Sequence, residues 1–339
     1  MYSRIKAIRT FLPEKKLTNS ELTEQFPDAD INKIVNKTGI SLRSISSDVE
    51  CSSDLGVKAA EKLLTENICS PTDIDFLLFC TQSPDYFLPT TACLIQERLQ
   101  LPTSCGALDF NLGCSGFIYG LSLAKGLIEI NAASNVLLIT AETYSKYIHP
   151  QDKSVKTIFS DGAAATLITS INDDSITDPI GDFIFGTDGK GAKNLIVPAG
   201  GMRLPKSKET KSESTDSSGN IRSKENLYMD GGEIFNFTLN TIPSAVNQLL
   251  TRSNLDINDI DYFIFHQANK FMLEALRKNL KIPTEKFCIN MEGYGNTVSS
   301  SIPMAMEIAL NQGTIFEGSR VMLVGFGVGY SWAATIVTI

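Results

Sequence analysis

The stretch EKLLTENICSPTDIDFLLFC, residues 61–80, recurs without gaps as NQLLTRSNLDINDIDYFIFH, residues 247–266. Both copies share Leu-Leu-Thr near their start and Asp-Ile-Asp just before their last five residues. Each copy predicts the end of a helix, a polar turn and a short apolar strand. Apolar strands that alternate with helices are typical of βαβ units, whose sheets are buried on both faces. The repeated stretch therefore predicts the α/β fold class.

Two further matches extend the repeat. SNVLLI at 134–139 resembles SRVMLV at 319–324, and AATLIT at 164–169 resembles AATIVT at 333–338. Because the matches occur in the same order in both parts of the chain, they indicate duplication. We therefore predict two pseudo-symmetric halves, residues 1–172 and 173–339.

One segment interrupts this pattern. Residues 203–226, RLPKSKETKSESTDSSGNIRSKEN, are almost free of large apolar side chains. Such a segment buries too little surface to offset its ordering entropy. We expect a mobile polar insertion in the second half; a docking segment for a partner is the alternative.

Composition excludes several classes of protein. The net charge of -8 over 339 residues gives no basic face for nucleic acid. No apolar stretch approaches the roughly 18 residues of a membrane span. The seven cysteines form no CxxC pair, and there are only two histidines. We therefore expect neither a disulfide framework nor a metal site, and a cytoplasmic protein.

The first candidate for chemistry is Cys114, in DFNLGCSGF at 109–117. An apolar stretch leads into small residues around the cysteine, and a helical pattern follows. This places the thiol at a strand-to-helix turn, where the helix N-terminus is expected to lower its pKa. A buried structural cysteine in a glycine-rich turn is the alternative.

Two residues of the second half complete a candidate triad. His266 ends the second copy of the repeated strand, where the first copy has Cys80. Asn296, in GYGNTVSS at 293–300, precedes a helical stretch and matches the position of Cys114 across the repeat. Taken alone, His266 reads as a core histidine and Asn296 as a helix N-cap. Together with Cys114 they predict nucleophilic catalysis.

The fourth element is GFGVGYSW at 325–332. Alternating glycines after an apolar strand suit a backbone that offers N–H groups to a developing oxyanion. A simple tight turn is the alternative.

These motifs carry a resemblance. CSGF at 114–117, HQAN at 266–269, YGNT at 294–297 and GFGVGYSW resemble, in this order, the signatures of the type III 3-oxoacyl-[acyl-carrier-protein] synthases of the thiolase superfamily. The similarity extends to TGI at 38–40 and FSDGAAA at 159–165. The resemblance implies a thiolase-like five-layered αβαβα fold, a homodimer and a decarboxylating Claisen condensation in fatty-acid or related metabolite biosynthesis.

The resemblance also implies roles for single residues. Cys114 would accept an acyl group from acyl-coenzyme A or acyl carrier protein, and His266 and Asn296 would hold the carbonyl of a malonyl thioester. Backbone N–H groups of Cys114 and Val328 would form the oxyanion hole. No cofactor or metal is implied. The implied substrate-binding residues are Lys37, Lys153, Gly231, Asn269, Lys270 and Phe326.

The chain departs from the family pattern around coenzyme A. Lys33, Lys37 and Lys153 stand where many members carry tryptophan or arginine, and Phe271 replaces an arginine after HQAN. Lysine binds phosphate but does not stack on adenine as planar side chains do. We therefore expect a longer or unusual acyl donor, one that a carrier protein can bring. We also predict that a basic rim of Lys33, Lys37, Lys153 and Lys270 recognises the thioester carrier by charge; solvated surface lysines are the alternative.

The same superfamily contains other functions. An acyltransferase that moves an acyl group to oxygen or nitrogen without decarboxylation is the main alternative. Elongating synthases need a second catalytic histidine, but His149 lies far from every motif. Hydroxymethylglutaryl synthases need a glutamate where this chain has Gln82. A non-catalytic scaffold is disfavoured because all three triad residues are present.

Overall fold

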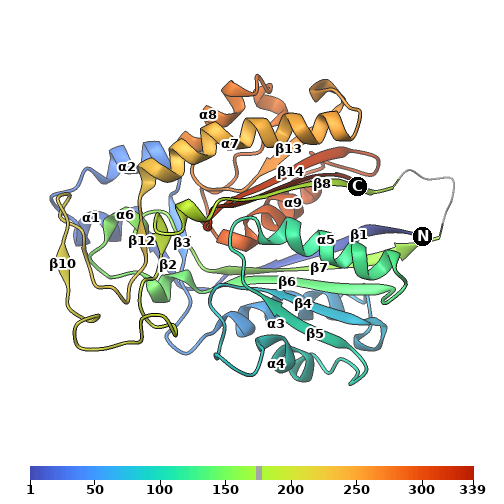
Figure 1. The fold of residues 1–339 in the computed structure, drawn as a ribbon, viewed down its shortest axis with the longest axis horizontal. Coiled ribbons are helices and arrows are strands. Elements are labelled where there is room, and N and C mark those ends of the chain that lie inside the picture. The colour runs from blue at the N-terminus through green and yellow to red at the C-terminus, as the bar shows by residue number, and fades with distance from the viewer. Residues whose placement is uncertain (173–177) are drawn as a thin grey trace.

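The structure is a computed structural model, and it describes residues 1–172 and 178–339. Two sheets form its centre (Figure 1). The first has the strand order β1-β7-β6-β4-β5, with β1 (Tyr2–Phe11), β4 (Phe76–Cys80), β5 (Gly106–Phe110), β6 (Asn135–Glu142) and β7 (Gly162–Ile171). The second has the order β13-β14-β15-β8, with β8 (Ile180–Thr187), β13 (Tyr262–Phe265), β14 (Arg320–Gly327) and β15 (Ser331–Thr338).

The two sheets have the same pairing pattern. β4 runs parallel to β6 as β13 runs parallel to β14, and the antiparallel series β6-β7-β1 corresponds to β14-β15-β8. Where the first sheet ends in β5, the second has a single parallel bridge between Phe263 and Phe287. The predicted pseudo-symmetry is therefore confirmed in the described chain.

Helices fill three layers around the sheets (Figure 1). α5 (Gly116–Glu129) and α9 (Ser301–Asn311) pack between the two sheets. α3 (Ser52–Thr65) and α4 (Thr91–Arg98) cover the outer face of the first sheet. α7 (Gly231–Arg252) covers the outer face of the second, with α8 (Lys270–Asn279) packed against it. This is the predicted αβαβα order.

The repeated stretch has the predicted local structure in both copies. A short 3-10 turn separates helix from strand, η1 (Pro71–Asp73) in the first copy and η4 (Ile257–Asp259) in the second. Asp75 accepts the first backbone N–H of β6 at 2.9 Å, and its equivalent Asp261 accepts that of β14 at 2.8 Å. The same aspartate thus ties each strand to its parallel neighbour.

The smaller elements gather at one end of the molecule, on the left of Figure 1. They include β2 (Lys16–Thr18), α1 (Asn19–Gln25), α2 (Ile31–Thr38), β3 (Leu42–Ser44), η2 (Tyr144–Tyr147), α6 (Lys153–Lys156), β9 (Leu195–Ile196), β10 (Ser214–Thr215), β11 (Ile221–Arg222) and β12 (Tyr228–Met229). The remaining 3-10 turns are η3 (Gly189–Gly191), η5 (Thr284–Lys286) and η6 (Val298–Ser300).

Residues 203–226 form a long excursion between β9 and β12. Most of them are exposed, as their composition predicts, but the segment contains the antiparallel hairpin of β10 and β11. Its mobility stays a prediction. So does the boundary between the halves, because residue 173 lies outside the described residues. No helix in the described ranges is long and apolar enough to cross a bilayer.

Candidate active site

Cys114 lies between the end of β5 and the start of α5. It is 4% exposed, and the backbone N–H of Val328 and its own N–H approach the sulfur. A Cβ at Gly327, the last residue of β14, would lie 2.7 Å from Sγ. Only glycine therefore lets β14 pass this close to the thiol.

His266 directly follows β13 and is buried. Its Nδ1 lies 2.7 Å from the hydroxyl of Ser301, the first residue of α9, and that hydroxyl also accepts the N–H of Gln267 at 3.3 Å. Since the Ser301 oxygen already accepts one hydrogen bond, its proton is available to Nδ1. We assign the imidazole proton to Nε2 on the ground that Ser301 donates to Nδ1.

Asn296 precedes η6, and its amide orientation is fixed by the chain. Oδ1 accepts the N–H of Val298 at 2.9 Å, which leaves Nδ2 directed at His266, 3.5 Å from Nε2. The N–H groups of His266 Nε2 and Asn296 Nδ2 thus lie close enough to donate to the same acceptor atom. Val298 has φ +55, a left-handed conformation that costs a β-branched residue about 1–3 kcal/mol.

Burial sets the protonation of the site. Burial, with a contribution from Glu142, raises the pKa of Cys114 to about 12. Burial also lowers the pKa of His266 to about 3. The expected lowering of the cysteine pKa at the helix N-terminus is therefore wrong, because desolvation outweighs the two N–H donors. The resting site holds a neutral thiol beside a neutral imidazole.

Sequence reasoning missed Glu142, the last residue of β6. Its buried carboxyl accepts the N–H of Gln82 at 3.0 Å and the hydroxyls of Ser83 at 3.1 Å and Ser299 at 2.9 Å. Burial raises its pKa to about 8. It joins the loop after β4 to the turn that follows Asn296. A lone acidic residue directly after the apolar run 136–141 is the signal that could have revealed it.

A cavity of about 110 Å³ brings these groups together. It is lined by Cys114, His266, Asn296 and Gly327, all four of which are buried. Most other lining side chains are apolar, namely Ile158, Phe159, Leu195, Met229, Ile234, Ala268, Met272 and Phe326. Such a lining suits an acyl chain with few polar groups beyond the reacting carbonyl.

The predicted substrate-binding residues divide into two groups. Gly231, Asn269 and Phe326 line the cavity. Lys37, Lys153 and Lys270 are not among its lining residues.

The three lysines have different surroundings. The Lys37 ammonium lies 5.1 Å from the centre of the Phe271 ring. Lys270 packs against the end of α2, where a Cβ at Gly39 would lie 2.7 Å from its Cβ. Lys153 donates to the carbonyl of Ser218 at 2.5 Å, so it contacts the polar insertion instead of the cavity.

The described residues contain no group of three or more histidine, cysteine, aspartate or glutamate side chains placed to hold a metal ion. The site's polar groups are N–H donors, a thiol and a buried carboxyl. Their chemistry is that of acyl transfer.

Comparisons with known proteins agree with this geometry. The family model for 3-oxoacyl-[acyl-carrier-protein] synthase III matches residues 108–189, and its C-terminal model matches residues 250–339. A beta-ketoacyl-[acyl-carrier-protein] synthase III of Caldanaerobacter subterraneus is 37% identical, covering 97% of this chain and 95% of the relative. One from Clostridioides difficile is 36% identical, covering 98% and 97%.

Solved structures extend the agreement to the whole fold. A 3-oxoacyl-(acyl-carrier-protein) synthase III crystal structure is 51% identical with a TM-score of 0.98, covering 100% of both chains. A 3-oxoacyl-(acyl-carrier protein) synthase from Burkholderia xenovorans is 39% identical with a TM-score of 0.91, covering 100% of this chain and 94% of that one. Fold and relatives together define a condensing synthase of the thiolase fold. Within that class, the chain belongs to the 3-oxoacyl-[acyl-carrier-protein] synthase III family, as the resemblance predicts.

Proposed function

We propose that the chain catalyses a decarboxylating Claisen condensation of an acyl thioester with a malonyl thioester, through an acyl group on Cys114. The observation that carries the proposal is the convergence of His266 Nε2 and Asn296 Nδ2, 3.5 Å apart, in the cavity that contains the thiol. We assign the reaction to fatty-acid or related metabolite biosynthesis. Seven free thiols support a cytoplasmic setting.

The first half-reaction loads the enzyme. The sulfur of Cys114 attacks the thioester carbonyl, the donor's carbon–sulfur bond breaks, and the departing thiol takes the proton that Cys114 gives up. The N–H groups of Cys114 and Val328 would stabilise the tetrahedral oxyanion. Removal of one such donor typically costs about 3 kcal/mol.

The second half-reaction uses the converging donors. The malonyl thioester carbonyl would accept the N–H groups of His266 and Asn296, so that carbon dioxide leaves and its electron pair forms an enolate. The enolate carbon then attacks the acyl carbonyl and the bond to the Cys114 sulfur breaks. The sulfur leaves as a thiolate and takes up a proton from solvent, which restores the neutral thiol. A neutral imidazole suits this role because it keeps its Nε2 proton and donates it as a hydrogen bond.

We also propose that two copies assemble into a homodimer. Tyr86, Phe87 and Leu88, in the loop after β4, are 61%, 79% and 81% exposed. β5, at the edge of the first sheet, leaves one side of its backbone unpaired among the residues that the structure describes. An exposed apolar run and an open sheet edge together favour burial against a second copy. Sedimentation should show a dimer that Phe87→Lys weakens.

For the thioester carrier we propose recognition by three of the four rim lysines, Lys33, Lys37 and Lys270. The fourth, Lys153, contacts Ser218. All three lysines are exposed, and α2 packs against α8 at this place. Their charge would attract a phosphopantetheine phosphate or an acidic carrier protein despite the net charge of -8. Lys37→Glu with Lys270→Glu should raise KM for carrier-borne donors, and salt should reduce the difference. An equal response of a short pantetheine thioester without the phosphate would contradict this docking role.

Mass spectrometry of the intact protein tests the loading step. A panel of acyl thioesters should add one acyl group to the native chain and none to Cys114→Ala. Cys80→Ala is the matched control, because Cys80 is a second buried thiol close to the site. Acylation of Cys114→Ala would refute the assignment of the nucleophile.

A further inference from the structure

Residues 203–226, hereafter the arm, are inserted between two short strands whose residues line the cavity. The arm leaves the short sheet at β9 and returns at β12, and Leu195 and Met229 of these strands line the cavity. α6 packs against β12. In Figure 1 the arm's strand β10 lies at the same end of the molecule as α2 and α6.

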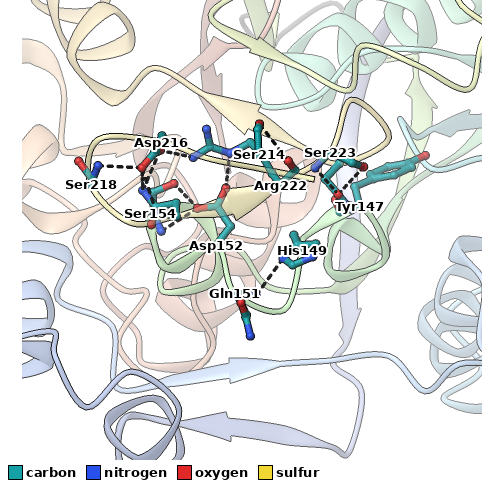
Figure 2. Close-up of polar contacts among 12 residues, drawn as sticks. Tyr147, His149, Gln151, Asp152, Ser154, Ser214, Asp216, Ser218, Arg222 and Ser223 are labelled. Atoms are coloured by element: carbon teal, nitrogen blue, oxygen red, sulfur yellow. Dashed lines mark hydrogen bonds and ion pairs between the residues drawn. The ribbon is translucent and has the colours of Figure 1, made fainter. Parts of the chain in front are cut away.

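A charged clamp fixes the arm to the first half (Figure 2). The Arg222 guanidinium donates to Asp152 at 2.7 Å and to Asp216 at 2.7 Å, and it lies 5.3 Å from the centre of the Tyr228 ring. The side chain of Asp152 is only 1% exposed. A buried carboxylate with a hydrogen-bonded partner of this kind is costly to separate from it. The arm therefore has a defined position over α6.

Backbone contacts strengthen this position. The N–H of Ile221 donates to the carbonyl of Gln151 at 3.3 Å, and that of Leu227 donates to Tyr147 at 2.8 Å. His149 accepts the N–H of Gln151 on Nδ1 and approaches Glu213 of the arm with Nε2 at 3.1 Å. The contacts follow the chain from 147 to 152, immediately before Lys153.

The tip of the arm contacts Lys153. The Lys153 ammonium donates to the carbonyl of Ser218 at 2.5 Å, and a Cβ at Gly219 would lie 3.7 Å from it. Gly219 has φ +77, a conformation that lets the tip turn over the lysine. A phosphate group that binds this ammonium would compete for it with the Ser218 carbonyl.

We propose that the arm selects the carrier of the acyl group, favouring an acyl carrier protein over coenzyme A. Coenzyme A brings an adenosine and additional phosphates, and the resemblance places three lysines where many members meet them, Lys33, Lys37 and Lys153. Of these three, Lys153 contacts the arm. A carrier protein brings a phosphopantetheine whose protein part stays outside. This inference rests on the proposed function, and it names the donor class for the same site.

The charges on the arm agree with this choice. The arm contains six lysines and arginines and four acidic residues, in a chain whose net charge is -8. Within the described chain, three of these acids contact a cation or His149, namely Glu213, Asp216 and Glu225. Four exposed cations form no ion pair with described residues, namely Arg203, Lys208, Lys211 and Lys224. This surface suits an acidic carrier.

The test compares three donors of one acyl group, carried by acyl carrier protein, coenzyme A or pantetheine, in loading of Cys114. The native chain should load from the carrier with a kcat/KM at least about tenfold above that for coenzyme A. A tenfold ratio corresponds to the free energy of one charge-assisted hydrogen bond. A shortened arm, in which an Asn-Gly turn replaces residues 216–220 between Thr215 and Ile221, should raise the coenzyme A value about tenfold. Pantetheine loading should not change.

Two further variants make the result specific. Lys153→Ala should cancel the gain of the shortened arm, since the gain comes from its uncovered ammonium. Ser217→Ala, an exposed neighbour in the tip, is the matched control and should behave like the native chain. If the variant with the shortened arm no longer loads even from pantetheine, the double variant Asp152→Asn with Arg222→Gln is used in its place. It breaks the ion pair that holds the arm and leaves no buried charge without a partner.

The outcomes separate the two proposals. Equal loading of the native chain from carrier and coenzyme A, or no gain for coenzyme A when the arm is shortened or released, would overturn the role of the arm. Failure of all three donors to acylate Cys114 in the native chain would instead refute the proposed function.

Discussion

Gly327 offers a direct test of the site's geometry, because its substitution acts on the nucleophile alone. A Cβ at this position would lie 2.7 Å from the Cys114 sulfur and 2.9 Å from its Cβ. Ordinary contacts between such atoms are about 3.5–4.0 Å, so Gly327→Ala is about 1 Å too close. The φ of Gly327 lies outside the left-handed region, and alanine therefore adds no backbone strain.

The size of the effect follows from that overlap. The thiol must move by about 1 Å, and a misplacement of this size typically costs about 10² in rate. Overpacking of a buried contact costs about 1–3 kcal/mol of unfolding free energy, which a domain of this size can tolerate. We expect Gly327→Ala to fold and to load acyl groups about a hundredfold more slowly.

Gly126→Ala is the matched control. Gly126 lies in α5, the same helix that follows Cys114, and no atom lies within 4 Å of its added Cβ. Alanine there should add about 1 kcal/mol of stability through helix propensity and leave loading unchanged. Rapid-quench loading followed by mass spectrometry measures both rates. Native loading by Gly327→Ala would refute the close approach of β14 to the nucleophile.

Three other predictions follow from the electrostatics. Because burial raises the pKa of Cys114 to about 12, its alkylation by iodoacetamide should accelerate about tenfold per pH unit up to pH ~9.5, and a plateau near neutral pH would contradict this. Because burial raises the pKa of Glu142 to about 8, the folded state binds its proton more tightly than the unfolded state, and Tm should fall between about pH 5 and 8. Glu142→Gln should make Tm less dependent on pH in this range. An unchanged dependence would show that other groups cause it. Asn296→Ala should slow decarboxylation about 10²–10³-fold but leave acyl loading nearly intact, and equal losses would favour a cysteine–histidine base pair.

Much of the fold could be predicted because the same sequence pattern occurs in both halves of the chain. One copy of the stretch 61–80 resembles any buried strand with a polar turn, but its recurrence at 247–266 fixes two equivalent units. The triad followed from the same symmetry. Cys114 and Asn296 each precede a helix between the sheets, and His266 ends a repeated strand, so the three meet near the pseudo-twofold axis.

What the sequence could not provide depends on tertiary packing. The position of Cys114 at the N-terminus of α5 predicts a lowered pKa for its thiol. Burial of the thiol raises that pKa instead. Ser301, which orients the imidazole, contacts a residue 35 positions away. The composition of the arm predicts exposure, yet its position comes from Arg222 and Asp152, which lie 70 positions apart.

A single-turnover experiment tests the central claim most directly. Protein acylated on Cys114 is mixed with a malonyl thioester labelled in its free carboxyl group, and carbon dioxide and products are counted. We predict one carbon dioxide and one 3-oxoacyl product for each acyl group lost, and retention of the acyl group without carbon dioxide release in His266→Ala. Transfer of the acyl group from Cys114 to a hydroxyl or amine acceptor without carbon dioxide release would contradict the account.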